Sequence, residues 1–321
     1  MFSGRRHPVL EPELLEAIVE AIPEWLGALL VPTTYIGSVF VIVPAIILAY
    51  WWAPDRLGAL IPAFFAYYGL MASIKSLNSA TRPDVDPAVG AEVFPELYST
   101  WYGHATAISS TSFPSGNAMV PAVIIGLLIV DLRISTLRRR ALVGGFAIAT
   151  IGFTRLGLGV HYPIDVVGGI ALGLGLVGVV LLCRRVFDDG VGAMFVVALV
   201  VAFASVWLRS NGFGVPTWDG IQGSNRVLAF GGAVGGLLAW RVGRATEWRY
   251  ARDALGRVGT FTAVLAVVGV TYAIHTTITH PLVTMCWAAV AFGAIIALPH
   301  VVPTRDEFAA TLGLDPARGG A

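Results

Sequence analysis

Long apolar runs separated by short polar stretches dominate the chain. The runs with the length of a membrane-crossing helix lie at about 33–52, 57–74, 115–132, 141–157, 163–183, 191–208, 226–240, 258–275 and 282–300. In hydrocarbon every backbone N–H and C=O needs an internal partner, so runs of this kind are expected to be helices. The pattern predicts an all-α, polytopic transmembrane bundle with about nine spans.

A different pattern precedes the first run, between Val9 and Leu30. Apolar positions recur there at helical spacing, and acidic residues fill most of the remaining positions. The apolar face holds Leu14, Leu15, Ile18, Val19 and Ile22, and the acidic positions are Glu11, Glu13, Glu16, Glu20 and Glu24. We expect an amphipathic helix that lies at the membrane interface.

Composition supports a membrane protein and excludes several function classes. Hydrophobic residues make up 56% and charged residues 13% of the chain, whereas soluble proteins carry roughly 25% charged residues. A net charge of +1 gives no basic surface for nucleic acid. Cys183 and Cys286 fall inside apolar runs, where a cysteine is usually a small buried hydrophobe. We find no residues with metal-ligand spacing and no dinucleotide fingerprint, so neither a metal nor a cofactor is predicted.

The positions of the basic residues predict an orientation in the membrane. Arginines concentrate in one alternating set of connections: Arg56, Arg133, Arg138, Arg139, Arg140, Arg184, Arg185, Arg241, Arg244, Arg249, Arg252, Arg257, Arg305 and Arg318. The positive-inside rule places this set in the cytoplasm. The amino terminus is then extracytoplasmic, and the carboxy terminus is cytoplasmic.

The first polar motif lies at the outer end of the second run. Lys75 and Arg82 stand seven residues apart, and Pro83 follows directly. A planar guanidinium and a compact ammonium could bracket a phosphate group. The alternative is a pair of interfacial cations that reach toward lipid headgroups.

The second motif, Phe113-Pro-Ser-Gly-Asn-Ala-Met119, opens the third run. Proline and serine before an apolar run mark a helix amino terminus. Free N–H groups and the helix dipole favour an anion at such a terminus. Most such sites are simply helix caps.

The third motif contains Arg155, His161 and Asp165, in the order Arg-x5-His-x3-Asp. If a helix begins near Tyr162, His161 and Asp165 meet across one turn. A carboxylate on one ring nitrogen fixes the tautomer and leaves the other nitrogen as a nucleophile. All three motifs fall on the predicted extracytoplasmic side.

Together the three motifs resemble the signature of the type 2 phosphatidic-acid phosphatase and vanadium haloperoxidase superfamily, in its membrane phosphatase branch. That signature reads Lys-x6-Arg-Pro, then Pro-Ser-Gly-His, then Ser-Arg-x5-His-x3-Asp, and Thr154 stands here in place of its serine. The resemblance covers about residues 57–183. Together with the hydropathy pattern, it divides the chain into four expected segments: a polar start with the interfacial helix at 1–32, a catalytic-core bundle at 33–185, a four-span extension at 186–301 and a cytoplasmic tail at 302–321.

The resemblance also implies roles for single residues. His161 would attack phosphorus and form a phosphohistidine, and Asp165 would orient it. The phosphoryl oxygens would be held by Lys75, Arg82, Ser115, Gly116 and Arg155. These cations would stabilise charge as a metal does in other phosphatases, so no metal is expected. The implied substrate is a lipid phosphate or polyprenyl diphosphate, with membrane lipid as the surroundings.

A second position departs from the signature besides Thr154, because Asn117 replaces the histidine that in the family protonates the leaving oxygen. Asparagine cannot act as a general acid. Three interpretations follow. The substrate is a diphosphate that needs no acid, another residue such as His104 donates the proton, or the protein binds or transports a phosphorylated lipid without turnover. A vanadate-dependent haloperoxidase fits the membrane context less well, and transfer of the phosphoryl group to an acceptor other than water stays open.

Overall fold

The computed structural model describes residues 12–107, 111–211, 225–246 and 280–301, together with a few isolated residues between 247 and 279. These described residues are helical apart from short connections, and they contain no strand. The helices are α1 (Pro12–Glu20), α2 (Glu24–Ile36), α3 (Val39–Trp52), α4 (Pro54–Leu57), α5 (Leu60–Leu77), η1 (Ala91–Val93), α6 (Glu96–Thr106), α7 (Gly116–Asp131), α8 (Leu137–Gly157), α9 (Pro163–Val186), α10 (Gly190–Asn211), α12 (Asn225–Ala245) and α14 (Pro281–Val301). The all-α prediction is confirmed.

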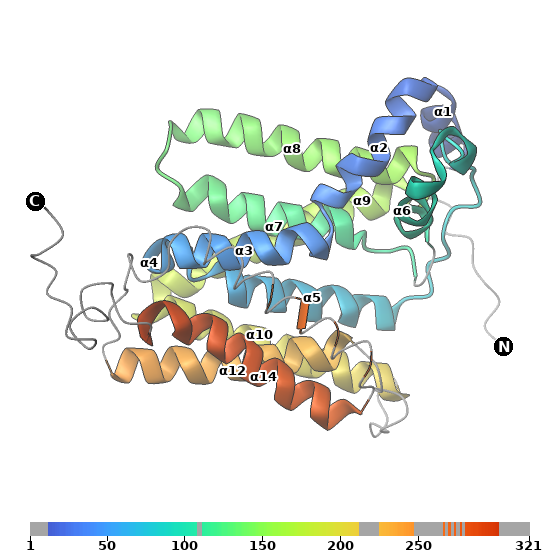
Figure 1. The fold of residues 1–321 in the computed structure, drawn as a ribbon. Coiled ribbons are helices and arrows are strands. Elements are labelled where there is room, and N and C mark those ends of the chain that lie inside the picture. The colour runs from blue at the N-terminus through green and yellow to red at the C-terminus, as the bar shows by residue number, and fades with distance from the viewer. Residues whose placement is uncertain are drawn as a thin grey trace, which may run out of the picture.

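The long helices lie in two groups that share α5 (Figure 1). In one group α7 packs against α8 and α9, and in the other α12 packs against α10 and α14. Helix α5 contacts α7 in the first group and α10 in the second. A continuous cluster of buried apolar side chains extends from α3 through α5 and α7 to α14. The carboxy-terminal helices therefore share one core with the helices that carry the motifs.

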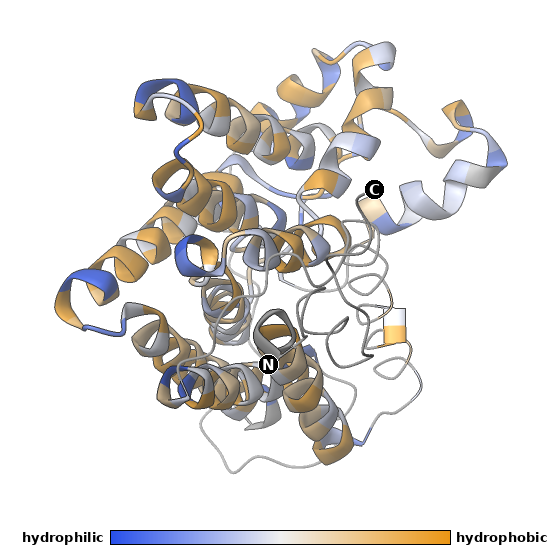
Figure 2. Ribbon diagram, turned by 60° about the vertical axis from the view of Figure 1, so that its left-hand side comes forward, coloured by the Kyte–Doolittle hydropathy of each residue, from blue (hydrophilic) through white to orange (hydrophobic). Residues whose placement is uncertain are grey.

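Hydropathy and length identify the chain as an integral membrane protein. Among the described residues three helical segments are long and apolar enough to cross a membrane: Pro54–Leu77, Pro163–Val186 and Gly190–Arg209. The bent pair α2 and α3 adds a fourth if it is counted as one span. Large apolar side chains also cover much of the outer surface, including Phe146, which is 74% exposed, and hydrophobic colour dominates the helices in Figure 2. Such a surface needs lipid rather than water around it.

The predicted count of nine spans is not confirmed. Helix α7 and the Pro281–Ala297 part of α14 are apolar but have fewer than 18 residues, and α8 carries three arginines in its first turn. The predicted span at 258–275 and the predicted tail at 302–321 lie outside the described residues, apart from isolated positions in the former.

The amino-terminal segment divides at other residues than the sequence pattern indicates. A helix over 9–30 and a span over 33–52 were expected, whereas the structure breaks the chain before Glu24 and again at Gly37 and Ser38. Pro23 accounts for the first break because proline favours a helix start. At the second break, a Cβ on Gly37 would lie 3.0 Å from the carbonyl oxygen of Asn117. The bend of 45° between α2 and α3 therefore forms where the chain packs against α7 and α8.

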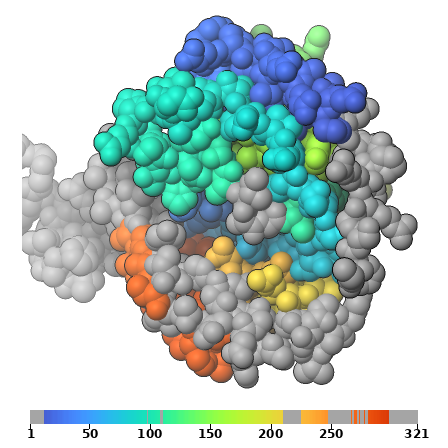
Figure 3. Space-filling model, turned by 90° about the vertical axis from the view of Figure 1, so that its right-hand side faces the viewer, coloured from blue at the N-terminus to red at the C-terminus, as the bar shows by residue number. Residues whose placement is uncertain are grey.

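Helices α1, α2 and α6 form a cap over one end of the bundle, where α8 ends and α9 begins (Figures 1 and 3). A second apolar cluster, separate from the main core, joins the cap to the chain between these helices. It contains the buried residues Ile22, Leu30, Val31, Ala105, Leu158 and Val160. Part of the apolar face of α1 thus packs on the protein itself: Leu15 is fully buried, whereas Leu14 is exposed.

Small residues bring α9 close to α7. A Cβ on Gly169 would lie 2.6 Å from the carbonyl oxygen of Ser115, and one on Gly173 would lie 2.6 Å from that of Met119. Only glycine permits this approach, which is typical of helix contacts in membranes. The contact holds the first turn of α7 beside the first turn of α9, where the second and third motifs lie.

A side chain of α3 compensates for a proline in α14. Pro299 has no backbone N–H, so the carbonyl of Ile295 has no helical partner four residues on. The Nε1–H of Trp51 donates to this oxygen at 2.8 Å. The neighbouring Tyr50 hydroxyl donates to the Ile296 carbonyl at 3.1 Å. These contacts fasten the last described helix to the amino-terminal half of the bundle.

Substitution of Trp51 by Phe tests this contact. We expect a loss of about 1–2 kcal/mol, because a buried carbonyl would be left without a donor. The thermal unfolding midpoint of the detergent-purified protein should fall by several degrees. Trp25→Phe is the matched control, since Trp25 is 68% exposed. Equal midpoints for the two variants would contradict the assignment.

Candidate functional site

The motif residues gather at the capped end of the bundle. Lys75 lies in the last turn of α5, Gly116 begins α7, and Arg155 lies in the last turn of α8. His161 stands in the connection between α8 and α9, and Asp165 lies in the first turn of α9. Helix starts and ends from four elements therefore supply the polar groups, whereas their apolar middles form the core.

His161 and Asp165 form a buried pair with a third residue, Ser112. Nδ1 of His161 lies 3.5 Å from Oδ2 of Asp165, and both side chains are almost fully buried. The hydroxyl of Ser112 donates to the same Oδ2 atom and lies 3.5 Å from Nδ1 of His161. The N–H of Tyr162 donates to that oxygen at 2.9 Å, which caps α9. Asp165 thus has its position fixed from two segments of the chain.

The surroundings determine which ring nitrogen of His161 carries the lone pair. Nε2 lies 3.2 Å from Nη1 of Arg82. A guanidinium only donates hydrogen bonds, so Nε2 must accept and carries the lone pair. The proton of the neutral ring is then on Nδ1, on the side of Asp165. This tautomer directs the unprotonated nitrogen toward Arg82, as a nucleophilic histidine would require.

The protonation equilibrium of His161 favours the neutral ring. Burial lowers the pKa of His161 below its ordinary value of 6.5, and the positive charges of Arg82 and Arg155 lower it further. Asp165 acts in the opposite direction, through its hydrogen bond and its negative charge. The imidazole is therefore unprotonated at neutral pH, as nucleophilic attack requires.

The short segment from Leu158 to Val160 connects α8 to His161, and its backbone conformation determines where His161 lies. Gly159 has φ +65°, a conformation that L side chains rarely adopt, and a Cβ there would lie 2.5 Å from the carbonyl oxygen of Val85. Nη1 of Arg82 donates to the carbonyl of Val160 at 2.8 Å. The first motif and the third motif are therefore joined directly.

The start of α7 has features that suit an anion. The N–H groups of a first helical turn have no partner in the helix, and the dipole there favours negative charge. The Ser115 hydroxyl is fully buried and has no hydrogen-bond partner, whereas the Ser115 N–H donates to the carbonyl of Asp165 at 3.0 Å. A buried hydroxyl without a partner is rare in proteins, and here it lies at a helix amino terminus. Together these features suit a phosphoryl oxygen.

Arg155 links the site to the cap. Its Nη1 donates to the Thr34 hydroxyl at 2.8 Å and to the Ala105 carbonyl at 3.2 Å. Its Nε is buried without a hydrogen-bond partner. Two cap elements therefore hold the guanidinium, and one donor is left for an acceptor such as a phosphoryl oxygen.

Lys75 reaches the chain that precedes α7. Its ammonium donates to the carbonyl of Thr111 and lies 3.5 Å from that of Ser112. The Asn78 amide donates to the Phe113 carbonyl at 2.9 Å. The first motif thus positions the backbone of Ser112, and Ser112 positions Asp165.

Asn117 and His104 occupy different surroundings. Asn117 is half-buried in the first turn of α7, and its side chain makes no hydrogen bond to another described residue. His104 lies on α6 and is exposed. Among the residues that the structure describes, no group of three or more His, Cys, Asp or Glu side chains is arranged to hold a metal ion.

Sequence reasoning did not find Ser112, Thr34 or Gly159. Thr34 is 121 residues from Arg155 along the chain, and Ser112 is 53 residues from Asp165. A lone serine or threonine gives no signal at such separations. Gly159 stands inside the third motif, and a glycine between a helix end and a histidine is a signal for a positive φ.

Fold and site define an all-helical integral membrane protein with a buried cationic site at one end. Comparison with known families then identifies the segment that carries this site. Residues 56–189 match the family model described as the PAP2 superfamily. All three motifs fall within it.

Two solved structures are similar to the chain. One is the first transmembrane PAP2-type phosphatidylglycerolphosphate phosphatase from Bacillus subtilis, at 24% identity over 56% of this chain and 86% of that chain, with a TM-score of 0.45. The other is LpxE from Aquifex aeolicus, at 25% identity over 51% of this chain and 90% of that chain, with a TM-score of 0.41. No curated protein matches the chain.

Substitution of Gly159 by Ala tests the geometry of the segment before His161. We expect it to cost about 1–2 kcal/mol for the left-handed conformation, with a further cost for the contact with Val85. The unfolding midpoint should therefore fall. Gly145→Ala in α8 is the control, because a Cβ there meets nothing within 4 Å, and alanine favours helix. A midpoint for Gly159→Ala at or above that of the parent protein would contradict the strained path.

Proposed function

We propose that the protein is a membrane phosphatase that releases phosphate from a lipid phosphate or polyprenyl diphosphate. The observation that carries the proposal is the arrangement around His161. Its Nε2 faces Arg82 at 3.2 Å, and its Nδ1 faces Asp165 at 3.5 Å. A binding site for phosphate needs cations but no oriented, unprotonated nucleophile, so this pair favours turnover.

The proposed reaction has two steps. In the first, the lone pair on Nε2 of His161 attacks phosphorus, the phosphorus–oxygen bond to the organic group breaks, and its electrons leave with that oxygen. The Nδ1 proton stays on the side of Asp165. In the second, water attacks the phosphohistidine, the phosphorus–nitrogen bond breaks, and inorganic phosphate leaves. Lys75, Arg82, Arg155 and the first turn of α7, with Ser115 and Gly116, stabilise the charge on the phosphoryl oxygens in both steps.

Asn117 restricts which leaving groups suit this site. An alkoxide leaving group needs a proton, and general acid catalysis typically contributes about 10²–10⁴-fold. A diphosphate expels a phosphate monoester, which needs much less help. The site therefore needs no general acid to hydrolyse a diphosphate, whereas the missing acid would slow hydrolysis of a simple monophosphate.

We also propose that the site faces away from the cytoplasm. Arg138, Arg139 and Arg140 lie in the first turn of α8, and Arg184 and Arg185 lie in the last turn of α9. Arg155 and Asp165 lie at the opposite ends of the same two helices. The positive-inside rule then assigns the arginine-rich end to the cytoplasm.

The activity is tested by phosphate release from a polyprenyl diphosphate and a phosphatidate, with detergent-purified full-length protein. His161→Ala should lower the rate to background, roughly 10³-fold or more. His104→Ala is the matched control and should keep the diphosphate activity, because His104 is exposed on α6. Loss of activity in both variants, or in neither, would contradict the assignment of the nucleophile.

Restoring the missing histidine tests the leaving-group argument. In Asn117→His we expect phosphatidate hydrolysis to rise by about 10²–10⁴-fold, with a much smaller change on the diphosphate. If Asn117→His raised both hydrolysis rates by a similar factor, the lack of a proton donor at position 117 would not explain a preference for diphosphates.

The pH dependence follows from the lowered pKa of His161. Attack requires the neutral ring, which is lost only as the pH falls through the folded-state pKa of His161. That pKa lies below 6.5, so kcat/KM should be constant between pH 6 and 7 and fall at lower pH. Arg82→Met removes a positive charge that lowers this pKa and should move the acid limb upward. An acid limb at or above pH 6.5 in the wild type would contradict the buried, unprotonated histidine.

Asn117 also supports a second candidate, a protein that binds or transports a phosphorylated lipid without hydrolysing it. The two candidates differ in the role of His161. Pure binding predicts that His161→Ala keeps its affinity for inorganic phosphate and that the wild type and Asn117→His both release none. Phosphate release by either protein that depends on His161 decides for the enzyme.

A further inference from the structure

Helix α2 of the cap contacts a residue of the candidate site, although it lies outside the segment that matches the family model. Thr34 stands in the last turn of α2, whereas the match covers residues 56–189. Its hydroxyl accepts a hydrogen bond from Nη1 of Arg155 at 2.8 Å, across 121 residues of chain. Thr34 is 2% exposed and Arg155 is 6% exposed. The amino-terminal segment therefore reaches the third motif in a contact that is shielded from solvent.

Helix α6 supports the same contact from the other side of the cap. Its Ala105 carbonyl accepts from Nη1 of Arg155 at 3.2 Å. The Tyr35 hydroxyl of α2 donates to the Trp101 carbonyl of α6 at 2.8 Å, and the centres of the two aromatic rings lie 5.2 Å apart. Helices α2 and α6 are thus fastened to each other, and both hold one nitrogen of the Arg155 guanidinium.

The partners of Arg155 in the cap are neutral. They are a hydroxyl and a main-chain carbonyl, and no carboxylate among the described residues lies within 4.0 Å of the guanidinium. A buried charge is costly without a counter-ion, so the positive charge of Arg155 remains available to a bound anion. This charge already acts on the nucleophile: burial lowers the pKa of His161, and the charges of Arg82 and Arg155 lower it further.

The two cap contacts also fix the orientation of the guanidinium. Both engage Nη1 and leave the buried Nε of Arg155 without a hydrogen-bond partner. A buried donor without a partner is rare, and an oxygen of a bound phosphate would satisfy it. The guanidinium is planar, so its donors reach an oxygen with good geometry only when the plane is held. Without the Thr34 hydroxyl, one of the two contacts that hold this plane is lost.

We propose that Thr34 is a positioning residue for the phosphate site, and that its hydroxyl fixes the Arg155 guanidinium for contact with a phosphoryl oxygen. The inference rests on the proposed function, because it needs a phosphate group beside Arg155. It gives the amino-terminal helix α2 a part in the reaction, although none of the three motifs lies in this helix. Thr34 acts through Arg155 and makes no contact with the substrate itself.

The first experiment measures the affinity for inorganic phosphate by calorimetry, with full-length protein in detergent. Thr34→Val keeps the shape of the side chain and removes the acceptor, so phosphate should bind about tenfold or more weakly. Thr34→Ser keeps the hydroxyl and should bind phosphate within about threefold of the parent protein. The matched control is Thr33→Val, because Thr33 is only half-buried and its side chain makes no hydrogen bond to another described residue. It should leave the phosphate affinity unchanged.

A double-mutant cycle separates positioning from packing. In the Arg155→Met background, Thr34→Val should weaken phosphate binding by less than about threefold further, because the group that Thr34 positions is already gone. A threonine that only stabilises the cap would contribute its full factor in both backgrounds. The kcat/KM for a polyprenyl diphosphate should follow the same pattern, and unfolding midpoints show whether each variant is folded. If Thr34→Val does not fold, Thr34→Ala is compared with Thr34→Ser, since these two variants differ only in the hydroxyl.

Three results would overturn the inference: parent-like phosphate affinity in Thr34→Val, an equal loss in Thr34→Ser, or an equal factor for Thr34→Val with and without Arg155. Phosphate release by the unmodified protein is measured in parallel. Release together with phosphate binding that ignores the Thr34 hydroxyl keeps the phosphatase and removes the role of Thr34. Binding that depends on this hydroxyl, without release, supports the role of Thr34 and removes the hydrolysis. Absence of both binding and release removes the proposed function and the inference together.

Discussion

The carboxylate of Asp165 joins the parts of the molecule on which the site depends. One of its oxygens accepts from the Ser112 hydroxyl and the Tyr162 N–H and faces Nδ1 of His161. The main chain of the same residue accepts from the N–H of Ser115. The start of α9, the chain before α7 and the histidine ring are therefore fixed relative to one another by a single residue. Because the pair is buried, its electrostatic interactions are stronger than in water, and each polar partner matters more.

The surrounding helices bury this network and hold its residues in position. Gly169 and Gly173 let α9 approach α7, so the first turns of the two helices meet. The cap holds Arg155 through Thr34 and Ala105. The carboxy-terminal helices contribute at a distance, since Arg226 of α12 donates to the Ser76 hydroxyl, next to Lys75, at 2.7 Å and to the Ser205 carbonyl at 2.8 Å. The extension is thus packed against the helix that carries the first cation.

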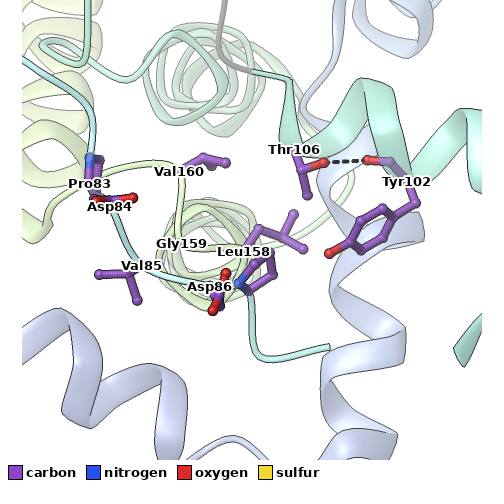
Figure 4. A pocket seen from close by; sticks show the side chains of 10 residues that line it. Pro83, Asp84, Val85, Asp86, Tyr102, Thr106, Leu158, Gly159 and Val160 are labelled. Carbon is purple, nitrogen blue, oxygen red and sulfur yellow. Dashed lines mark hydrogen bonds between the residues drawn. The ribbon is translucent and has the colours of Figure 1, made fainter. Parts of the chain in front are cut away.

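The sequence alone predicts the all-helical membrane class well, because apolar runs in lipid have few structural solutions. It also singles out His161 and Asp165, since four residues at a helix start form one turn. Other features depend on contacts between distant segments. At the break between α2 and α3, Gly37 lies against the main chain of Asn117, and the hydroxyl of Ser112 donates to Asp165, which is 53 residues away along the chain. The cavity lined by residues 83–87, by α6 and by residues 158–160 (Figure 4) could not be predicted either, because three separate segments of the chain form it.

The central claim is that His161 becomes phosphorylated during turnover, and trapping the intermediate tests it most directly. Protein mixed with a radiolabelled polyprenyl diphosphate or phosphatidate, and quenched in base, should carry label that is stable to base and lost in acid. Phosphohistidine has this stability, and peptide mapping should place the label on His161. We expect wild-type protein to carry the label and Asp165→Asn to carry less of it. His161→Ala should carry none. Phosphate release by wild-type protein that never carries acid-labile label, or label on His161→Ala, would contradict the account.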